Sequence, residues 1–201
     1  MAICSERQTL TKVESRQRMR IFILDGNPDP ENGPFHTFLE ELERSLEARQ
    51  VRVTITTLRE KEIGFCTGCW GCWVKTPGEC VIADDSQEVC RNFINSDLVI
   101  FLSPVIMGFT SAMLKKTQDR LIPLLHPHIE LVDGESHHKK RYPAYPKLGL
   151  VVEKAGDTDD GDLRIIRDIY RRFALNFKSE LSFMKTTGDP VEEIADEIGH
   201  L

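Results

Sequence analysis

The sequence predicts a single α/β domain with a doubly wound parallel sheet that helices cover on both faces. Five short apolar or β-branched runs alternate strictly with segments that carry one apolar stripe. Such alternation is typical of a parallel sheet, because each crossover between parallel strands is itself a helix packed on the sheet. The length of 201 residues suits one domain, and 40% apolar with 29% charged residues is an ordinary globular balance.

The five strands are predicted from short runs that end in turn signals. The first run ends at a glycine turn, the second alternates β-branched and polar residues, and the third is the most apolar in the chain. A short apolar run bounded by turns is typical of a strand buried on both faces. The predicted strands are 20–27, 51–58, 97–105, 147–153 and 180–187.

Helices are predicted after each strand from apolar residues at helical spacing. The first stripe runs from Phe35 to Leu46, and the stripe after the fourth strand runs from Leu163 to Phe177. Asp85 and Glu88 have the spacing of a capping box, which predicts that a helix begins there. The remaining helices are expected from Ser111 to Leu125, where Pro123 disturbs the last turn, and after Asp189 and Pro190.

Five strands in this order favour a flavodoxin-like sheet with strand order 2-1-3-4-5. Ligands of that fold bind beyond the carboxyl ends of the strands, beside strands 1 and 3. Two glycine-bearing loops lie there, 25–37 and 103–112. A glycine turn before a helix offers N–H groups to an anion, and a glycine allows a flat ring to approach the backbone. Either loop could also be a plain connection that binds nothing.

Charge and composition exclude several classes of partner. The net charge of −6 argues against a nucleic-acid partner. No apolar run approaches the ~20 residues that a membrane span needs, so we expect no membrane partner. Residues 1–18 lack the apolar core of a signal peptide and are predicted to be a mobile N-terminal leader. We expect a cytoplasmic protein, in which thiols stay reduced and clustered cysteines indicate metal or redox chemistry.

Four of the six cysteines lie in residues 65–80, with the spacing C-x2-C-x2-C-x7-C. Thiolates three residues apart can face one centre from a tight loop, as they do in zinc sites and ferredoxins. The compact run suits a [4Fe–4S] cluster better than zinc, whose sites usually pair two separate C-x2-C turns. Packing groups or redox-active thiols without metal are the third possibility. The candidate metal ligands are Cys66, Cys69, Cys72 and Cys80.

A polar insertion over residues 126–146 is too long for an ordinary connection. It carries four histidines, but they lack the further ligands of a metal set. Its apolar residues, among them Ile129 and Leu131, need more cover than the sheet alone provides. The insertion therefore predicts a subunit contact, most simply in a homodimer, although a higher homo-oligomer is compatible with it.

These features resemble the NADPH-dependent FMN reductase and iron–sulfur flavoprotein branch of the flavodoxin-like superfamily. Members show a Gly-Ser-Pro-Arg-type loop after strand 1, a cysteine-bearing loop after strand 2 and Ser-Pro-Val-Tyr after strand 3. The matching stretches here are Gly26-Asn27-Pro28-Asp29, the cysteine loop, Ser103-Pro104-Val105-Ile106, Leu114-Lys115 and Asp119-Arg120. The resemblance runs from about residue 19 to 188, and makes residues 19–201 a flavodoxin-like FMN-binding domain.

The resemblance implies FMN, with NAD(P)H as electron donor and an unknown electron acceptor as partner. Iron–sulfur flavoproteins hold a [4Fe–4S] cluster on a compact four-cysteine motif of this form, whereas relatives without a cluster keep similar cysteines, so the resemblance leaves the cluster open. The FMN phosphate would contact residues of the first loop, namely Gly26, Asn27, Pro28, Gly33 and Thr37. The ring would contact residues after strands 3 and 4, namely Ser103, Pro104, Val105, Ile106, Met107, Gly108, Gly156 and Asp157.

Three positions depart from the family pattern: Asn27, Asp29 and Ile106 replace the usual serine, basic residue and tyrosine. Asp29 puts negative charge beside the expected phosphate, and Ile106 removes an aromatic contact. The chemistry would belong mostly to the flavin, so no side-chain acid or base is required as catalyst. Two other classes of function stay open: an electron carrier without NAD(P)H activity, and a non-enzymatic protein of the same fold.

Overall fold

The computed structural model describes residues 18–132 and 134–201. The predicted leader 1–18 therefore lies outside the described residues except for Arg18. Five parallel strands form the sheet in the order β2-β1-β3-β7-β8, which is the predicted order 2-1-3-4-5. The strands are β1 (Arg20–Asp25), β2 (Arg52–Thr57), β3 (Leu98–Ile106), β7 (Lys147–Glu153) and β8 (Leu181–Thr186).

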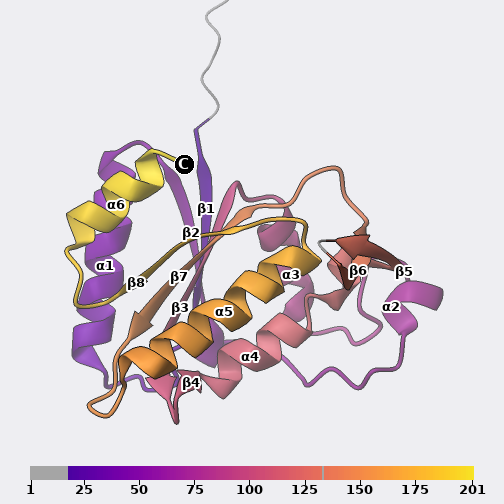
Figure 1. Cartoon of the computed structure of the whole chain (residues 1–201), viewed down its shortest axis with the longest axis horizontal. Coiled ribbons are helices and arrows are strands. Elements are labelled where there is room, and N and C mark those ends of the chain that lie inside the picture. The colour runs from indigo at the N-terminus through magenta and orange to yellow at the C-terminus, as the bar shows by residue number, and fades with distance from the viewer. Residues whose placement is uncertain (1–17, 133) are drawn as a thin grey trace, which may run out of the picture.

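Helices cover both faces of the sheet (Figure 1). α1 (Gly33–Ala48) and α6 (Val191–Gly199) pack on one face, against a core that includes Ile21 and Ile23. The other face, which includes Phe22 and Leu24, carries three helices. These helices are α3 (Ser86–Ile94), α4 (Ala112–Asp119) and α5 (Asp160–Asn176). Successive residues of β1 thus point into opposite cores, as the period of two in a strand requires.

Three local features differ from the sequence predictions. The helix predicted to reach Leu125 ends at Asp119, because Pro123 has no N–H to donate to the carbonyl of that residue. A 3-10 turn, η2 (Ile122–Leu124), follows it. Asp85 lies at the N-cap of α3 but does not cap it, since its carboxylate accepts the Glu62 N–H instead (2.8 Å).

The sequence also missed three short strands. β5 (Leu125–Val132) and β6 (Glu135–Lys140) form an antiparallel hairpin within the insertion 126–146. Their side chains are mostly polar and partly exposed, so an apolar alternation could not reveal them. β4 (Phe109–Thr110) adds a sixth, antiparallel strand beside the end of β3. Among the helices of the described chain, none combines the length and apolarity that crossing a bilayer requires.

Candidate functional site

The carboxyl ends of β1, β3 and β7 meet at one edge of the sheet, as predicted for the flavin-binding loops. In the β-ladder Asp25 pairs with Leu102, and Pro104 pairs with Glu153. The candidate residues differ in exposure: Gly26, Asn27, Ser103 and Val105 are buried, and Pro104 and Gly108 are half-buried. The others are exposed at this edge, namely Pro28, Gly33, Thr37, Ile106, Met107, Gly156 and Asp157.

Gly26 packs the end of β1 against α4. Its N–H donates to the Leu102 carbonyl (2.8 Å), and its carbonyl accepts the hydroxyl of Ser111, the N-cap of α4. A Cβ at this position would lie 2.8 Å from the Cβ of Leu114, closer than real side chains approach. Glycine is required here by the neighbouring helix, so the effect of a substitution would not report on a phosphate alone.

The loop after β1 uses its own backbone donors. Asn27, which is fully buried, donates its N–H to Asp25 Oδ1 (2.9 Å) and accepts the Asp29 N–H on Oδ1 (3.1 Å). The Glu31 N–H donates to Asp29 Oδ1 (2.9 Å), and Asn32 Oδ1 caps α1 through the N–H of Phe35 (3.2 Å). The other N–H groups from residue 26 to residue 36 bond within the protein as well, and the three prolines have none.

This arrangement leaves no free backbone N–H for a phosphate within residues 26–36. Each expected donor already has an acceptor, and Asp29 and Glu31 leave negative charge at the surface of the loop. The guanidinium of Arg59 reaches this loop, where its Nη1 contacts buried Asp25 Oδ2 (3.1 Å) and the Asn27 carbonyl (3.5 Å). Sequence reasoning missed Arg59 because it follows β2, 32 positions after Asn27.

The loops expected to hold the ring have free backbone donors, unlike the loop after β1. β3 and β4 are joined by Met107 and Gly108, both with positive φ (52° and 76°), which is the geometry of a type I′ hairpin turn. The N–H groups of Met107, Gly108, Gly156 and Asp157 donate to no acceptor in the described part of the chain. These four amides at one edge could therefore bind the polar atoms of a flat heteroaromatic ring.

The four candidate metal ligands also come together. Cys66, Cys69, Cys72 and Cys80 all line one cavity of about 110 Å³, which lies beside the short helix α2 (Gly71–Val74). The rest of the wall is largely apolar and includes Trp70, Trp73, Ile82, Ile122 and Pro123. All four thiols are free. That they bind a metal cluster stays a prediction.

Two glycines allow the cysteine loop to fold so tightly. Gly68, between the first two cysteines, has φ +64°, a conformation that other residues rarely adopt. A Cβ at Gly71 would lie 2.5 Å from Val81 Cγ1, so the start of α2 packs directly against the chain that follows Cys80. In the described part of the chain, no three or more His, Cys, Asp or Glu side chains are arranged to hold a single metal ion. The four sulfurs that line the cavity are therefore not drawn together as the ligands of one ion.

The cysteines differ in their tendency to ionise. Hydrogen bonds from the Gly71 backbone and the Thr67 side chain lower the pKa of Cys69. Burial, followed by the neighbouring cysteines, raises the pKa of Cys72. Burial raises the pKa of Cys90 to about 12, so this fifth described cysteine stays a neutral thiol. Its thiol donates to the Arg120 carbonyl (3.4 Å), and it does not line the cavity of the other four.

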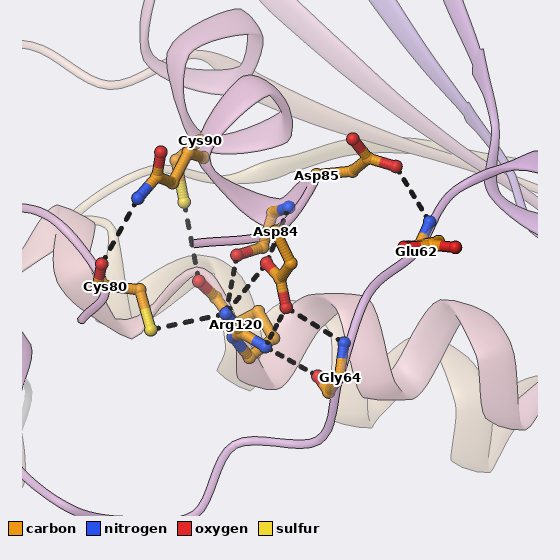
Figure 2. Close-up of polar contacts among 9 residues, drawn as sticks. Glu62, Gly64, Cys80, Asp84, Asp85, Cys90 and Arg120 are labelled. Atoms are coloured by element: carbon orange, nitrogen blue, oxygen red, sulfur yellow. Dashed lines mark hydrogen bonds and ion pairs between the residues drawn. The ribbon is translucent and has the colours of Figure 1, made fainter. Parts of the chain in front are cut away.

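Arg120 contacts both ends of the cysteine loop, at Gly64 and at Cys80 (Figure 2). Its side chain is 2% exposed and forms an ion pair with Asp84 (2.7 Å). Nη1 also donates to the Gly64 carbonyl (2.8 Å), and Nη2 donates to Ser86 Oγ (2.8 Å) and Cys80 Sγ (3.3 Å). Sequence reasoning placed Arg120 only in a family signature, because a position at the end of a helix does not reveal a contact 40 positions away.

Burial alone would raise the pKa of the Asp84 carboxyl, but its hydrogen bonds outweigh that effect. Donors from Ser86, Gly64 and Arg120 lower its pKa to about 2. For Arg120, burial alone would lower the pKa, yet the carboxylate of Asp84 raises it. Both groups are therefore charged at neutral pH, and each is the partner that makes burial of the other tolerable.

α4 connects the two candidate sites. Its N-cap, Ser111, donates to Gly26 at the sheet edge, and its C-cap, Arg120, lines the cysteine cavity. Eight helical residues rise about 12 Å, so the two sites lie at opposite ends of a short helix. Because the cysteine loop follows β2, which neighbours β1, the sequence predicts it close to the flavin loops. In the structure α4 separates the cysteine cavity from the predicted flavin site of the same chain.

The insertion packs on the cysteine loop. Trp73 donates its indole N–H to the Leu125 carbonyl (3.1 Å), and its ring lies 5.0 Å from that of His138. α2 and the β5–β6 hairpin accordingly lie side by side at one end of the molecule (Figure 1). His137 contacts Asn176 Oδ1 (3.0 Å), which gives this buried histidine a structural role.

Comparison with known proteins gives the family. Residues 19–152 match the model of the NADPH-dependent FMN reductase family. An iron–sulfur flavoprotein of Methanocaldococcus jannaschii is 33% identical over 106 residues, which is 53% of this chain and 53% of the relative. The chain thus matches about half the length of that relative.

Solved structures show the same fold at low sequence identity. The FMN-dependent NADH-azoreductase of Bacillus anthracis in complex with FMN has a TM-score of 0.63 and 13% identity, covering 90% of this chain and 99% of that chain. The NAD(P)H:quinone oxidoreductase of Methanothermobacter marburgensis has a TM-score of 0.64 and 15% identity, covering 89% and 90%. The match to the family model spans well over half of the sequence, and the chain belongs to the NADPH-dependent FMN reductase family of flavin-dependent oxidoreductases.

Proposed function

We propose that the chain is an FMN-dependent oxidoreductase that takes electrons from NAD(P)H and passes them to an acceptor, with a [4Fe–4S] cluster on its cysteine loop. The observation that carries the flavin assignment is the group of free amides at the ends of β3 and β7, on a chain of this family. When bound, FMN supplies hydride acceptance from a nicotinamide and electron release to an acceptor.

The chain's own residues would bind and orient the ring. The N–H groups of Met107 and Gly108 would donate to its polar edge, and those of Gly156 and Asp157 would approach from the next strand. Oriented amides of this kind favour negative charge that develops on a reduced ring. The buried candidates would act indirectly, because their hydrogen bonds fix the conformation of the loops that carry the exposed residues. These candidates are Gly26, Asn27 and Ser103.

The cluster assignment is supported by the shared, largely apolar cavity of Cys66, Cys69, Cys72 and Cys80. Four thiolates complete the ligand set of such a cluster. The relative from Methanocaldococcus jannaschii, which carries the name iron–sulfur flavoprotein, adds support. This cavity also favours the second candidate, an electron carrier that relays electrons without reacting with nicotinamide. We further propose a cytoplasmic location.

Anaerobic mixing of the FMN-loaded protein with NADH or NADPH tests the reductase directly. We expect bleaching of the flavin absorbance near 450 nm (roughly the usual flavin band), followed by reoxidation when a quinone is added. Gly108→Val should weaken FMN binding at least about tenfold, because valine is strained at φ +76° and its Cβ would lie 3.3 Å from Asp162 Oδ1. Gly134→Val, at a glycine with φ +81° in the distant hairpin, is the matched control. Reduction by dithionite but by neither nicotinamide would contradict the reductase and favour the carrier.

Replacing Asp29 tests the phosphate side of the site. Asp29→Arg removes the acceptor of the Glu31 N–H and reverses a charge at the loop surface. We expect FMN to bind more tightly by about 1 kcal/mol, the scale of an exposed charge interaction. Glu40→Arg, on the exposed side of α1, is the control for the change in net charge. Equal FMN affinities of Asp29→Arg and wild type in a fluorescence titration would place the phosphate elsewhere.

We also propose that the protein is a homo-oligomer, most simply a dimer. Large apolar side chains are exposed on the cysteine loop and on the hairpin, namely Phe65, Trp70, Val74, Ile129 and Leu131. Clustered exposed apolar residues usually mark an interaction surface. Sedimentation velocity at micromolar concentration should show a dimer or larger species, and Leu131→Asp should shift it toward monomer. A monomer under all conditions, with and without FMN, would remove this proposal.

A further inference from the structure

Arg120 is among the largest fully buried side chains of the described chain. Arginine is rarely buried in this way unless its charge is paired. The carboxylate of Asp84 provides the pair, through Nη1–Oδ2 (2.7 Å) and Nη2–Oδ1 (2.9 Å) contacts. Neutralising the charge therefore needs only these two contacts, and the remaining three link the guanidinium to Gly64, Ser86 and Cys80.

These contacts join the two ends of the cysteine loop. Gly64 lies just before the first cysteine, and its N–H also donates to Asp84 Oδ2 (3.0 Å). Cys80 is the last cysteine, and its carbonyl accepts from the Gln87 side chain (3.3 Å) while its Sγ accepts from Arg120 (3.3 Å). Figure 2 shows the contact of the Cys80 sulfur with Arg120. The last cysteine is thus the one whose position the surrounding side chains fix most directly.

Among the four cysteine sulfurs, within residues 18–132 and 134–201, only that of Cys80 receives a hydrogen bond from a charged side chain. Hydrogen bonds to the sulfur ligands are among the main factors that set the reduction potential of an iron–sulfur cluster. A cationic donor stabilises the reduced cluster more than the oxidised one, since reduction adds negative charge.

We propose that Arg120 is the positioning residue of the cysteine site: it holds the Cys80 sulfur at the cavity wall and, through its hydrogen bond, raises the reduction potential of the cluster bound there. This inference rests on the proposed cluster. A purely structural role would affect only the stability of the loop. The two roles differ in the reduction potential, which loop stability alone would not shift.

Two variants test the proposal while keeping the protein folded. Arg120→Lys keeps the positive charge beside Asp84 but lacks the planar fork that reaches Cys80, Ser86 and Gly64 together. The double variant Arg120→Gln/Asp84→Asn removes both charges, so neither partner is left buried and unpaired. Arg91→Gln is the matched control, because Arg91 lines a neighbouring cavity with Cys80 but makes no hydrogen bond to its sulfur.

The measurements are iron and acid-labile sulfide per chain after anaerobic reconstitution, the midpoint potential of the cluster, and urea unfolding as the check on folding. We expect the double variant to keep less than half of the wild-type iron, and both Arg120 variants to show a more negative midpoint potential. Arg91→Gln should match wild type.

Wild-type iron content and potential in both Arg120 variants would overturn the proposal, and so would an equal shift in Arg91→Gln. Loss of iron with no shift in the potential of the cluster that remains would reduce Arg120 to a structural residue, which also overturns it. A wild type that takes up no iron would instead overturn the proposed cluster, and this inference with it. The wild-type measurement therefore separates failure of the proposed function from failure of the role of Arg120.

Discussion

Asp84→Asn should lower the free energy of unfolding by about 3 kcal/mol at pH 7, because it leaves the buried guanidinium of Arg120 without a counter-charge. The effect should shrink as the pH falls. The Asp84 carboxyl has a pKa of about 2 in the folded protein, against an ordinary value of 3.8. A carboxyl group whose pKa is lowered by folding stabilises the folded protein at any pH above its ordinary pKa. This stability is lost as the pH falls from the ordinary pKa through the pKa of the folded protein. The contribution is about 2 kcal/mol.

Urea unfolding of both proteins between pH 7 and pH 3 would check this result. Wild type should lose stability more steeply than Asp84→Asn below about pH 4, near the ordinary pKa of the carboxyl. Asp85→Asn is a suitable control, because the Asp85 carboxylate accepts the Glu62 N–H, which an asparagine oxygen can also accept. Parallel pH profiles for wild type and Asp84→Asn would contradict the assigned pKa and the importance of the ion pair.

Cys69→Ser should abolish the binding of iron while FMN stays bound. Cys69 lines the shared cavity, and its lowered pKa makes it a ready thiolate ligand. Anaerobic reconstitution followed by iron and sulfide analysis should give about four of each per chain for wild type and almost none for the variant. The flavin site at the other end of α4 should be unaffected.

Cys90→Ser provides the control for this experiment. Cys90 is close in sequence to the cysteine loop, but its thiol donates to the Arg120 carbonyl and does not line the four-cysteine cavity. We expect it to keep its iron. Equal iron in Cys69→Ser and Cys90→Ser, or loss of iron in both, would contradict the assignment of ligands.

The sheet could be predicted from the sequence because the buried strands are apolar and alternate with amphipathic helices. The hairpin of β5 and β6 could not, since its strands are mostly polar, partly exposed and paired with each other rather than with the apolar sheet. The end of α4 before Pro123 was within reach of the sequence, because a proline removes the backbone donor that another helical turn needs.

The four cysteines were predicted as one site from their spacing, which two turns at Gly68 and Gly71 make possible. Arg120 and Asp84 were not, because a contact between the end of a helix and a distant loop leaves no local pattern. The loop after β1, residues 25–37, shows another limit of sequence reasoning. Glycine and asparagine after β1 suggested free amides, whereas Asn27 and Asp29 use these amides to fold the loop on itself.

The most direct test of the proposed flavin and iron–sulfur cofactors is their content in wild-type protein purified without oxygen. FMN, iron and acid-labile sulfide are measured per chain. We expect about one FMN with about four iron and four sulfide, together with flavin absorbance that NAD(P)H bleaches. Full FMN occupancy with no iron or sulfide, even after anaerobic reconstitution, would contradict the cluster and leave the cysteines as packing groups or redox-active thiols. A protein that binds neither FMN nor iron would contradict the proposed function as a whole.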